Sequence, residues 1–211
     1  QMYKSASPEM DDKTWRNTYP HLRRRAKTAN FGIGYGLTEQ GFVLREHCSL
    51  EEAKEAIRLY KSIVPIDAYF RSIRRDLERG YVENEFGRRR HMSHIRILKA
   101  MHEMTELEAA IREAINFPIQ SGGSDLHSIA SAATNESGAL RRRNCRIIQS
   151  VHDSLTFEVD LTDNEQVLET AWIIKNLWAK IAWETIKPDG KPLHWRVPVE
   201  LEWGQTWGTP Q

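Results

Sequence analysis

The sequence predicts an α+β protein in which helices come first and antiparallel strands with covering helices follow. Apolar residues recur at helical spacing in several segments between residues 20 and 135, whereas residues 146–151 and 155–159 alternate as strands do. The 211 residues are 40% hydrophobic. This is enough to build a core for one domain or two small ones.

The N-terminal half is expected to be mostly helical. Residues 1–19 carry turn signals and predict a loop with short helical pieces. A helix is expected from residue 20 to residue 31 or slightly beyond, ending in the glycines at positions 32, 34 and 36. Ser49 and Glu52 have capping-box spacing for a helix that stops at Pro65, and the next helix covers residues 66–79 with Gly80 as its cap.

The C-terminal half is expected to combine helices with strands. Residues 81–86 predict a short strand before the turn glycine Gly87. A helical pair over 103–116 and 124–135 is interrupted by Pro118 and the two glycines at 122 and 123. The alternating runs form a hairpin with residues 152–154 at its tip, followed by a long helix over 164–186 and a closing strand over 197–203.

The net charge of +1 hides a segregation of charge along the chain. Residues 13–38, 86–102 and 137–152 contain no acid and together carry +15, so the rest of the chain sums to −14. Each window holds an arginine triplet, at 23–25, 88–90 and 141–143. One triplet is often a solvated helix face, but three in acid-free windows predict unpaired guanidinium groups and a phosphate-bearing partner.

Composition excludes several classes of protein. No apolar run approaches the ~18 to 20 residues that a bilayer span needs, so no membrane partner is expected. Cys48 and Cys145 cannot form a disulfide framework and lack metal-ligand spacing. The two cysteines therefore argue against zinc and favour a reducing compartment.

The segment from Arg23 to Gly36 is the strongest local signal. Arg23, Lys27 and Phe31 are spaced four apart and share one helix face, and Tyr35 follows one turn later at the expected helix end. Two cations followed by two rings suit a nucleotide, with phosphates at the cations and sugar or base against the rings. A surface helix with scattered basic residues would show the same spacing.

Two weaker patterns leave alternatives open. Asp153, at the hairpin tip, is either a turn former or an oxygen ligand for Mg²⁺, which prefers one or two carboxylates together with substrate phosphates. Arg112, Asn116 and Gln120 are again four apart, although Pro118 interrupts the spacing. They are either exposed helix residues with a cap or groups that read acceptors in the minor groove of a duplex.

The motifs of the chain have a recognisable order. They read RRRAKTANFGIGYG from Arg23, GYVENEFGRRR from Gly80, REAINFPIQSGGSDL from Arg112 and QSVHDSL from Gln149, and the chain closes with VPVELEWG from Val197. In this order they resemble the family A (Pol I-type) DNA polymerases over nearly the whole length. The resemblance implies an incomplete right-hand polymerase fold, with a fingers subdomain over residues 1–105 and the C-terminal part of the palm over 106–211.

The resemblance also implies roles for the candidate residues. Arg23 and Lys27 would hold the triphosphate of a dNTP, with Lys27 also protonating the leaving pyrophosphate. Phe31 would pack on the incoming sugar and base, and Tyr35 would stack near the templating base. Asp153 would be one of two carboxylates that bind two catalytic Mg²⁺ ions. Primer-template DNA would be held by Arg88, Arg89, Arg90, Arg112, Asn116, Gln120 and His152.

The chain departs from the family pattern in three places. Ser154 stands where the family commonly has a glutamate, and residues 121–124 read SGGS where it often has GTAA. The family's first metal-binding aspartate lies farther upstream than the 26 residues that precede Lys27 allow. We therefore expect an N-terminal partner chain to carry that aspartate, the thumb and any exonuclease domain. Such a division would arise from a split or phage-type gene, a nicked polypeptide or a cloned piece. The expected location is the cytoplasm of a bacterial or phage-infected cell.

Two other functions stay open on the sequence. A single-subunit RNA polymerase shares a fingers helix with Arg, Lys and Tyr and can carry His-Asp-Ser at the palm hairpin, although Phe31, Asn116 and Gln120 favour deoxynucleotides. A non-catalytic subunit that grips primer-template DNA would keep the basic residues without needing Asp153.

Overall fold

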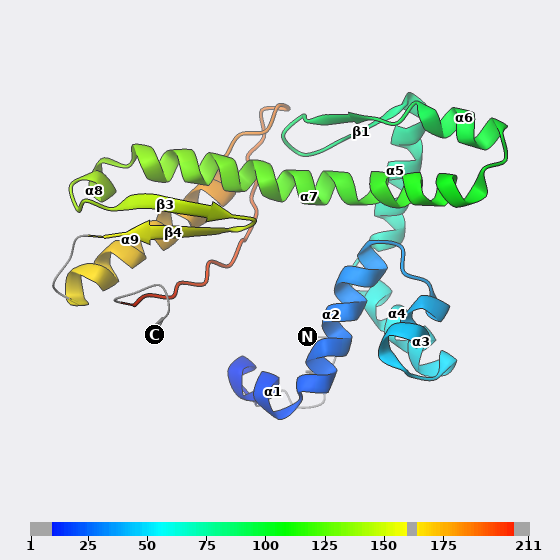
Figure 1. Ribbon diagram of the computed structural model, residues 1–211, viewed down its shortest axis with the longest axis horizontal. Coiled ribbons are helices and arrows are strands. Elements are labelled where there is room, and N and C mark those ends of the chain that lie inside the picture. Colours follow the sequence, from blue (N-terminus) through cyan, green and yellow to red (C-terminus); the bar gives the residue numbers. More distant parts are fainter. Residues whose placement is uncertain (1–9, 160–163, 205–211) are drawn as a thin grey trace. The chain divides into compact units, whose positions relative to one another are not determined.

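The computed structural model describes residues 10–159 and 164–204 and divides the chain into two compact units. Unit 1 comprises Gln1–Val82 and Arg89–Pro118, and unit 2 comprises Glu83–Arg88 and Ile119–Gln211. Figure 1 shows a mostly helical chain with two short two-stranded sheets. This architecture confirms the predicted α+β class.

The first part of unit 1 is a helical cluster made by α1 (Asp12–Thr18), α2 (Pro20–Gly34), α3 (Glu39–Glu46) and α4 (Leu50–Ile63). The capping box at the start of α4 is confirmed, since Ser49 Oγ accepts from the Glu52 N–H at 3.1 Å and the Glu52 carboxylate accepts from the Ser49 N–H at 2.9 Å. Helix α3 was not predicted because its eight residues form barely two turns. The buried core of the cluster comprises Ala29, Ile33, Phe42, Ala53, Ala56, Tyr60 and Ile66.

The second part of unit 1 is built on α5 (Ile66–Arg79), whose predicted bounds and Gly80 cap, at φ 89°, are confirmed. Strands β1 (Tyr81–Glu83) and β2 (Arg89–His91) and helix α6 (His94–Ala100) follow. The strand expected over residues 81–86 ends at Glu83, because Asn84 starts a turn by accepting the N–H groups of Phe86 and Arg88. The core buries Ile73, Leu77, Val82, Met92, Ile95, Leu107, Ala110, Ala114 and Ile115.

Helix α7 (Met104–Glu136) corrects the prediction of two helices over 103–116 and 124–135, since it is one helix with Pro118 inside it. Pro118 lacks the N–H that would reach Ala114, but Tyr69 of α5 donates its hydroxyl to the neighbouring Ile115 carbonyl at 2.5 Å. Gly122 does not break the helix either. It lets the Trp195 indole approach, since a Cβ there would lie 3.0 Å from the ring.

Unit 2 contains the rest of α7, α8 (Gly138–Arg141), β3 (Arg146–Val151), β4 (Ser154–Glu158) and α9 (Asn164–Glu184). The predicted hairpin is confirmed, with Val151 opposite Ser154 and a bulge between Ile147 and Gln149. The strand predicted over 197–203 is wrong, because this segment pairs with no strand of the described chain. Nor does any described helix have the length and apolar character required to cross a membrane.

Candidate functional site

Helix α2 presents the predicted stripe to solvent. One side of the helix exposes Arg23, Lys27 and Phe31, and the Phe31 side chain is 51% exposed. The other side is buried, with Ala29 0% and Ile33 3% exposed. The helix is therefore held by packing on one side and leaves two cations and a ring free to meet a ligand on the other. Lys27 Nζ lies 5.8 Å from the centre of the Phe31 ring, so the cation and the ring already adjoin.

The arginine triplet of α2 divides into paired and free groups. Arg24 Nε lies 3.5 Å from the buried Glu46 carboxylate, which also accepts the Thr28 hydroxyl at 2.6 Å. Arg25 lies 3.3 Å from Glu52. No carboxylate of the described residues pairs with Arg23 or Lys27. The two cations left without a counter-charge are therefore the two that the spacing placed beside the aromatic rings.

A tight motif at the end of α2 places Tyr35. The Leu37 N–H donates to the Gly32 carbonyl at 2.7 Å and the Gly36 N–H to the Ile33 carbonyl at 3.0 Å, while Gly36 has φ 79°. This is the Schellman pattern of helix ends. A Cβ on Gly32 would lie 2.4 Å from Leu37 Cδ2, so any larger residue there would force the Leu37 side chain to shift. Tyr35 is thereby held at the C-cap, one turn after Phe31, as predicted.

Two of the predicted primer-template residues belong to the unit 1 part of α7. Arg112 lies beside the end of α2, its Cγ 3.8 Å from where a Cβ on Gly36 would stand, and its guanidinium lies 3.7 Å from Glu108. The Asn116 Oδ1 atom is buried and has no hydrogen-bond partner among the described residues. Gln120, exposed on the same helix, belongs to unit 2.

The hairpin of unit 2 presents His152 and Asp153 at its tip. His152 has φ 54°, the left-handed conformation that non-glycine residues seldom adopt, and both side chains are exposed. Ser154 begins β4 and donates its hydroxyl to the Val151 carbonyl at 3.0 Å. A short turn between paired strands therefore fixes where the Asp153 carboxylate is displayed.

His127, to which the sequence assigned no role, connects this hairpin to α7 and α9. Its Nε2 atom lies 3.1 Å from Ser150 Oγ on β3, and its ring meets the Trp178 ring edge-on at 5.5 Å. The Trp178 indole N–H in turn donates to Thr134 Oγ1 at 3.0 Å. These contacts join residues distant in the sequence, so no local pattern could have revealed them.

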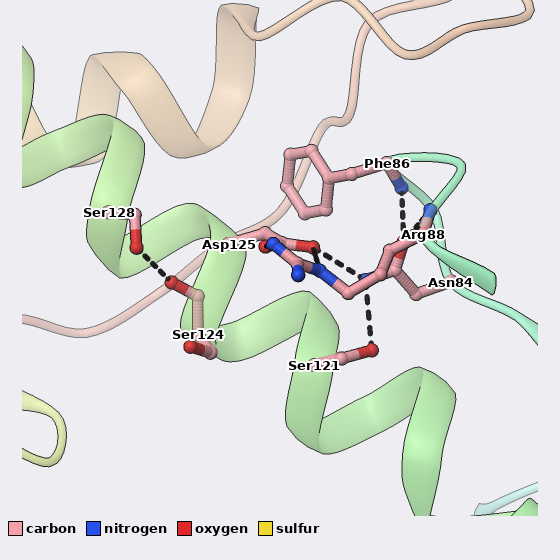
Figure 2. A network of polar contacts seen from close by, with 7 residues as sticks. All are labelled: Asn84, Phe86, Arg88, Ser121, Ser124, Asp125 and Ser128. Atoms are coloured by element: carbon pink, nitrogen blue, oxygen red, sulfur yellow. Dashed lines mark hydrogen bonds and ion pairs between the residues drawn. The ribbon is translucent and has the colours of Figure 1, made fainter. Parts of the chain in front are cut away.

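A network around Asn84 joins the turn after β1 to α7 (Figure 2). The buried Asn84 side chain donates to Ser121 Oγ at 2.9 Å and Asp125 Oδ2 at 2.7 Å, and accepts two backbone N–H groups of its own turn. Arg88 grips the same Asp125 carboxylate, with Nη2 to Oδ1 at 2.5 Å. The hydrogen bond from Arg88, aided by Asn84 and opposed by desolvation, lowers the pKa of Asp125.

The other two arginine triplets are also partly neutralised. Arg90 forms an ion pair with Glu113, Arg143 lies 2.9 Å from Glu169, and Arg89 lies over the Tyr81 ring at 4.7 Å. The expectation that acid-free windows leave the guanidinium groups unpaired is therefore wrong for five arginines, namely Arg24, Arg25, Arg88, Arg90 and Arg143. The carboxylates that pair with these arginines lie outside the three windows and reach them only in the folded chain.

The donor set at the hairpin tip fits part of a magnesium site. Asp153 is an exposed carboxylate on a fixed turn, and Mg²⁺ commonly binds one or two carboxylates together with substrate phosphates. No cluster of three or more His, Cys, Asp or Glu side chains that could hold a metal ion occurs among the described residues. Asp153 would therefore need further oxygen ligands.

Comparison with known proteins decides the family. The model of DNA polymerase family A matches residues 2–209. The chain belongs to the family A DNA polymerases. It is 29% identical over 191 residues to DNA polymerase I of Mycobacterium leprae and 32% identical over 191 residues to the thermostable DNA polymerase I of Thermus thermophilus. These alignments cover 90% and 89% of this chain but 19% and 21% of the relatives, so the chain spans about a fifth of their length.

A solved structure of the family supports the same assignment. The polymerase domain of Pol1 from M. smegmatis, in complex with DNA primer-template and dNTP, superposes with a TM-score of 0.62 at 31% identity. The match covers 77% of this family A chain and 28% of that one. The resemblance drawn from the motifs is thereby confirmed.

Proposed function

We propose that the chain is the fingers and C-terminal palm portion of a template-directed DNA polymerase, which adds dNTPs to the 3′-hydroxyl of a primer. The fingers would comprise residues 1–105 and the palm portion residues 106–211. Membership of family A supports this function, as does the M. smegmatis relative, which was solved with primer-template and dNTP.

The exposed face of α2 carries the proposal. Arg23 and Lys27 keep their charge available while neighbouring Arg24 and Arg25 are paired with glutamates. An anion with several negative oxygens is the ligand such a pair suits, and the adjoining Phe31 ring adds a stacking surface for the sugar and base. Tyr35, fixed at the helix end, would stack near the templating base.

Each residue then has a role in the reaction. Arg23 and Lys27 hold the triphosphate, and the Lys27 ammonium group gives a proton to the leaving pyrophosphate oxygen. Arg112, Asn116, Gln120 and His152 hold the primer-template. Arg88, Arg89 and Arg90 contact its phosphates in addition to their protein partners, since a guanidinium group has five N–H donors.

Asp153 is the metal-binding carboxylate of this chain. Two bound Mg²⁺ ions would supply activation of the primer 3′-hydroxyl and stabilisation of the charge on the phosphates. Asp153 offers one carboxylate, and Ser154 beside it offers none. We propose that an N-terminal polymerase chain contributes the second aspartate, together with the thumb and the rest of the palm.

Primer extension by the assembled enzyme tests this proposal. The 211-residue chain is combined with the N-terminal polymerase chain, primed template, Mg²⁺ and dNTPs. Asp153→Asn should lower the extension rate by at least about 100-fold, because removal of a metal ligand affects both ions. Glu158→Gln, a matched loss of charge at the other end of the same hairpin, should leave the rate within about two-fold.

Three outcomes would contradict parts of the proposal. Extension at full rate by the 211-residue chain alone would exclude the need for the partner. Full activity of Asp153→Asn would exclude its catalytic role and leave the non-catalytic DNA-binding subunit as the alternative. Preference for rNTPs over dNTPs would indicate an RNA polymerase.

A further inference from the structure

Helix α5 carries a cluster of arginines that the proposed polymerase chemistry does not use. Arg71, Arg74 and Arg75 are exposed and, together with Ala68, border one open surface of the helix. The opposite side of α5 is buried through Ile66, Ile73 and Leu77. The helix is thus anchored by its apolar face and presents three arginines on the opposite, exposed face.

The charge of this cluster is not neutralised within the described part of the chain. Two acids of α5 form ion pairs with other residues: Asp67 lies 3.0 Å from Lys61, and Asp76 lies 2.5 Å from Arg79. Glu78 is four residues after Arg74, but no ion pair joins them. Most other arginines described above have a carboxylate partner, so three adjacent guanidinium groups without one are a distinctive feature of unit 1.

The arginines of this exposed face indicate the class of ligand. Arginine side chains bind phosphate oxygens through their planar N–H groups. Among the described residues, no aromatic ring or amide that could recognise a base borders this surface, in contrast to α2, where Phe31 adjoins Lys27. The exposed arginine face therefore suits a run of phosphates whose bases face away, rather than a free nucleotide.

We propose that Arg71, Arg74 and Arg75 form a second nucleic-acid site, which binds the phosphodiester backbone of DNA without reading its sequence. The inference rests on the proposed function only in taking nucleic acid as the substrate of the protein. Arg71 and Arg75 lie one helical turn apart, about 6 Å along the axis, so the cluster contacts more than one phosphate.

Salt-dependent DNA binding by the 211-residue chain tests this site. Fluorescein-labelled oligo-dT and a duplex of equal length are titrated with the wild type and with Arg71→Gln/Arg74→Gln/Arg75→Gln over a range of salt. The slope of log K against log[salt] should become shallower by about 2 to 3 in the variant, because each lost phosphate contact removes close to one unit. Inorganic triphosphate should compete weakly with the oligonucleotides.

Two further variants serve as controls. Lys175→Gln/Lys180→Gln/Lys191→Gln removes the same charge from exposed positions of unit 2 and should keep the wild-type slope. Arg71→Lys/Arg74→Lys/Arg75→Lys keeps the charge and should also keep it, whether or not the glutamine variant folds well. A wild-type slope in the glutamine variant, an equal loss in the unit 2 control, or no DNA binding by the wild type would overturn the site.

Primer extension separates this site from the polymerase proposal. If Asp153→Asn abolishes extension and the α5 variant keeps its slope, the polymerase function stands and the second site is excluded. If the slope falls while Asp153→Asn still extends primers, the second site stands and the catalytic proposal is excluded.

Discussion

Arg88 and Asp125 form a bidentate ion pair that ties the turn after β1 to helix α7. The Arg88 Nε atom lies 3.0 Å from both carboxylate oxygens and Nη2 lies 2.5 Å from Oδ1. The Asp125 side chain is only 12% exposed, and Asn84 donates to it as well. A charge so placed stabilises the fold only while it is ionised and paired.

We predict that this network makes unit 2 sensitive to acid. The pKa of Asp125 is lowered by the Arg88 hydrogen bond, so its contribution is present above the unfolded-state pKa of about 3.9 and is lost as pH falls through the folded-state pKa. Asp125→Asn should lower the free energy of unfolding at pH 7 by about 1 to 3 kcal/mol, and the difference from wild type should shrink toward pH 3.

Thermal unfolding of both proteins from pH 7 to pH 3 measures this effect. Asp67→Asn is the control, because its pair with Lys61 is exposed and should contribute little at any pH. A stability difference between wild type and Asp125→Asn that stays constant over this range would contradict the assigned role of the ionised carboxylate.

The hydroxyl of Tyr69 should make unit 1 sensitive to alkali. Burial, with a smaller contribution from Asp76, raises the pKa of Tyr69 to about 12. Because the unfolded chain ionises near pH 10, the contribution of Tyr69 is complete below pH 10 and declines as the pH rises toward 12. Tyr69→Phe should cost about 1 kcal/mol at pH 7, through loss of the bond to the Ile115 carbonyl.

The comparison of Tyr69→Phe with wild type between pH 8 and pH 11 tests that assignment. The wild type should lose more stability than the variant over the last part of this range. If the two proteins lose stability in parallel, the hydroxyl is not protected by the fold.

The two glycines Gly32 and Gly123 should respond in opposite ways to alanine. A Cβ on Gly32 would overlap Leu37 Cδ2 at 2.4 Å, so Gly32→Ala should cost about 1 to 3 kcal/mol and disturb the turn that holds Tyr35. A Cβ on Gly123 meets nothing within 4 Å in the described chain, so Gly123→Ala should stabilise α7 by up to about 1 kcal/mol. Chemical denaturation of the two variants distinguishes them, and equal effects would contradict the close contact at Gly32.

Local chemistry allowed much of the fold to be predicted. The capping box of Ser49 and Glu52, the glycine cap at Gly80 and the hairpin at residues 151–154 depend on residues a few positions apart, and all three are confirmed. Helix α7 was missed because Pro118 and the glycines at 122 and 123 predicted a break, whereas Tyr69 and Trp195, which lie against the helix on either side of Pro118, are far away in the sequence. The closing strand was wrong because strand formation requires a paired neighbour, which alternation alone does not supply.

The candidate site was likewise predictable only in part. Helical periodicity correctly placed Arg23, Lys27 and Phe31 on one exposed face and Tyr35 at the helix end. It could not tell which arginines carry a free charge, because Glu46 and Asp125 reach Arg24 and Arg88 only in the folded chain. Likewise, the contact between His127 and Ser150 depends on how α7 lies along β3.

The central claim is that α2 presents Arg23 and Lys27 to the phosphates of a nucleotide and keeps Arg25 engaged with Glu52. Binding of a fluorescent dATP derivative to Arg23→Gln, with Arg25→Gln as the charge-matched control, tests it most directly. Loss of a charged hydrogen bond worth about 1.5 to 3 kcal/mol should weaken binding to Arg23→Gln by about 10- to 100-fold, whereas Arg25→Gln should stay within about two-fold of wild type. Equal weakening in both variants, or none in Arg23→Gln, would contradict the claim.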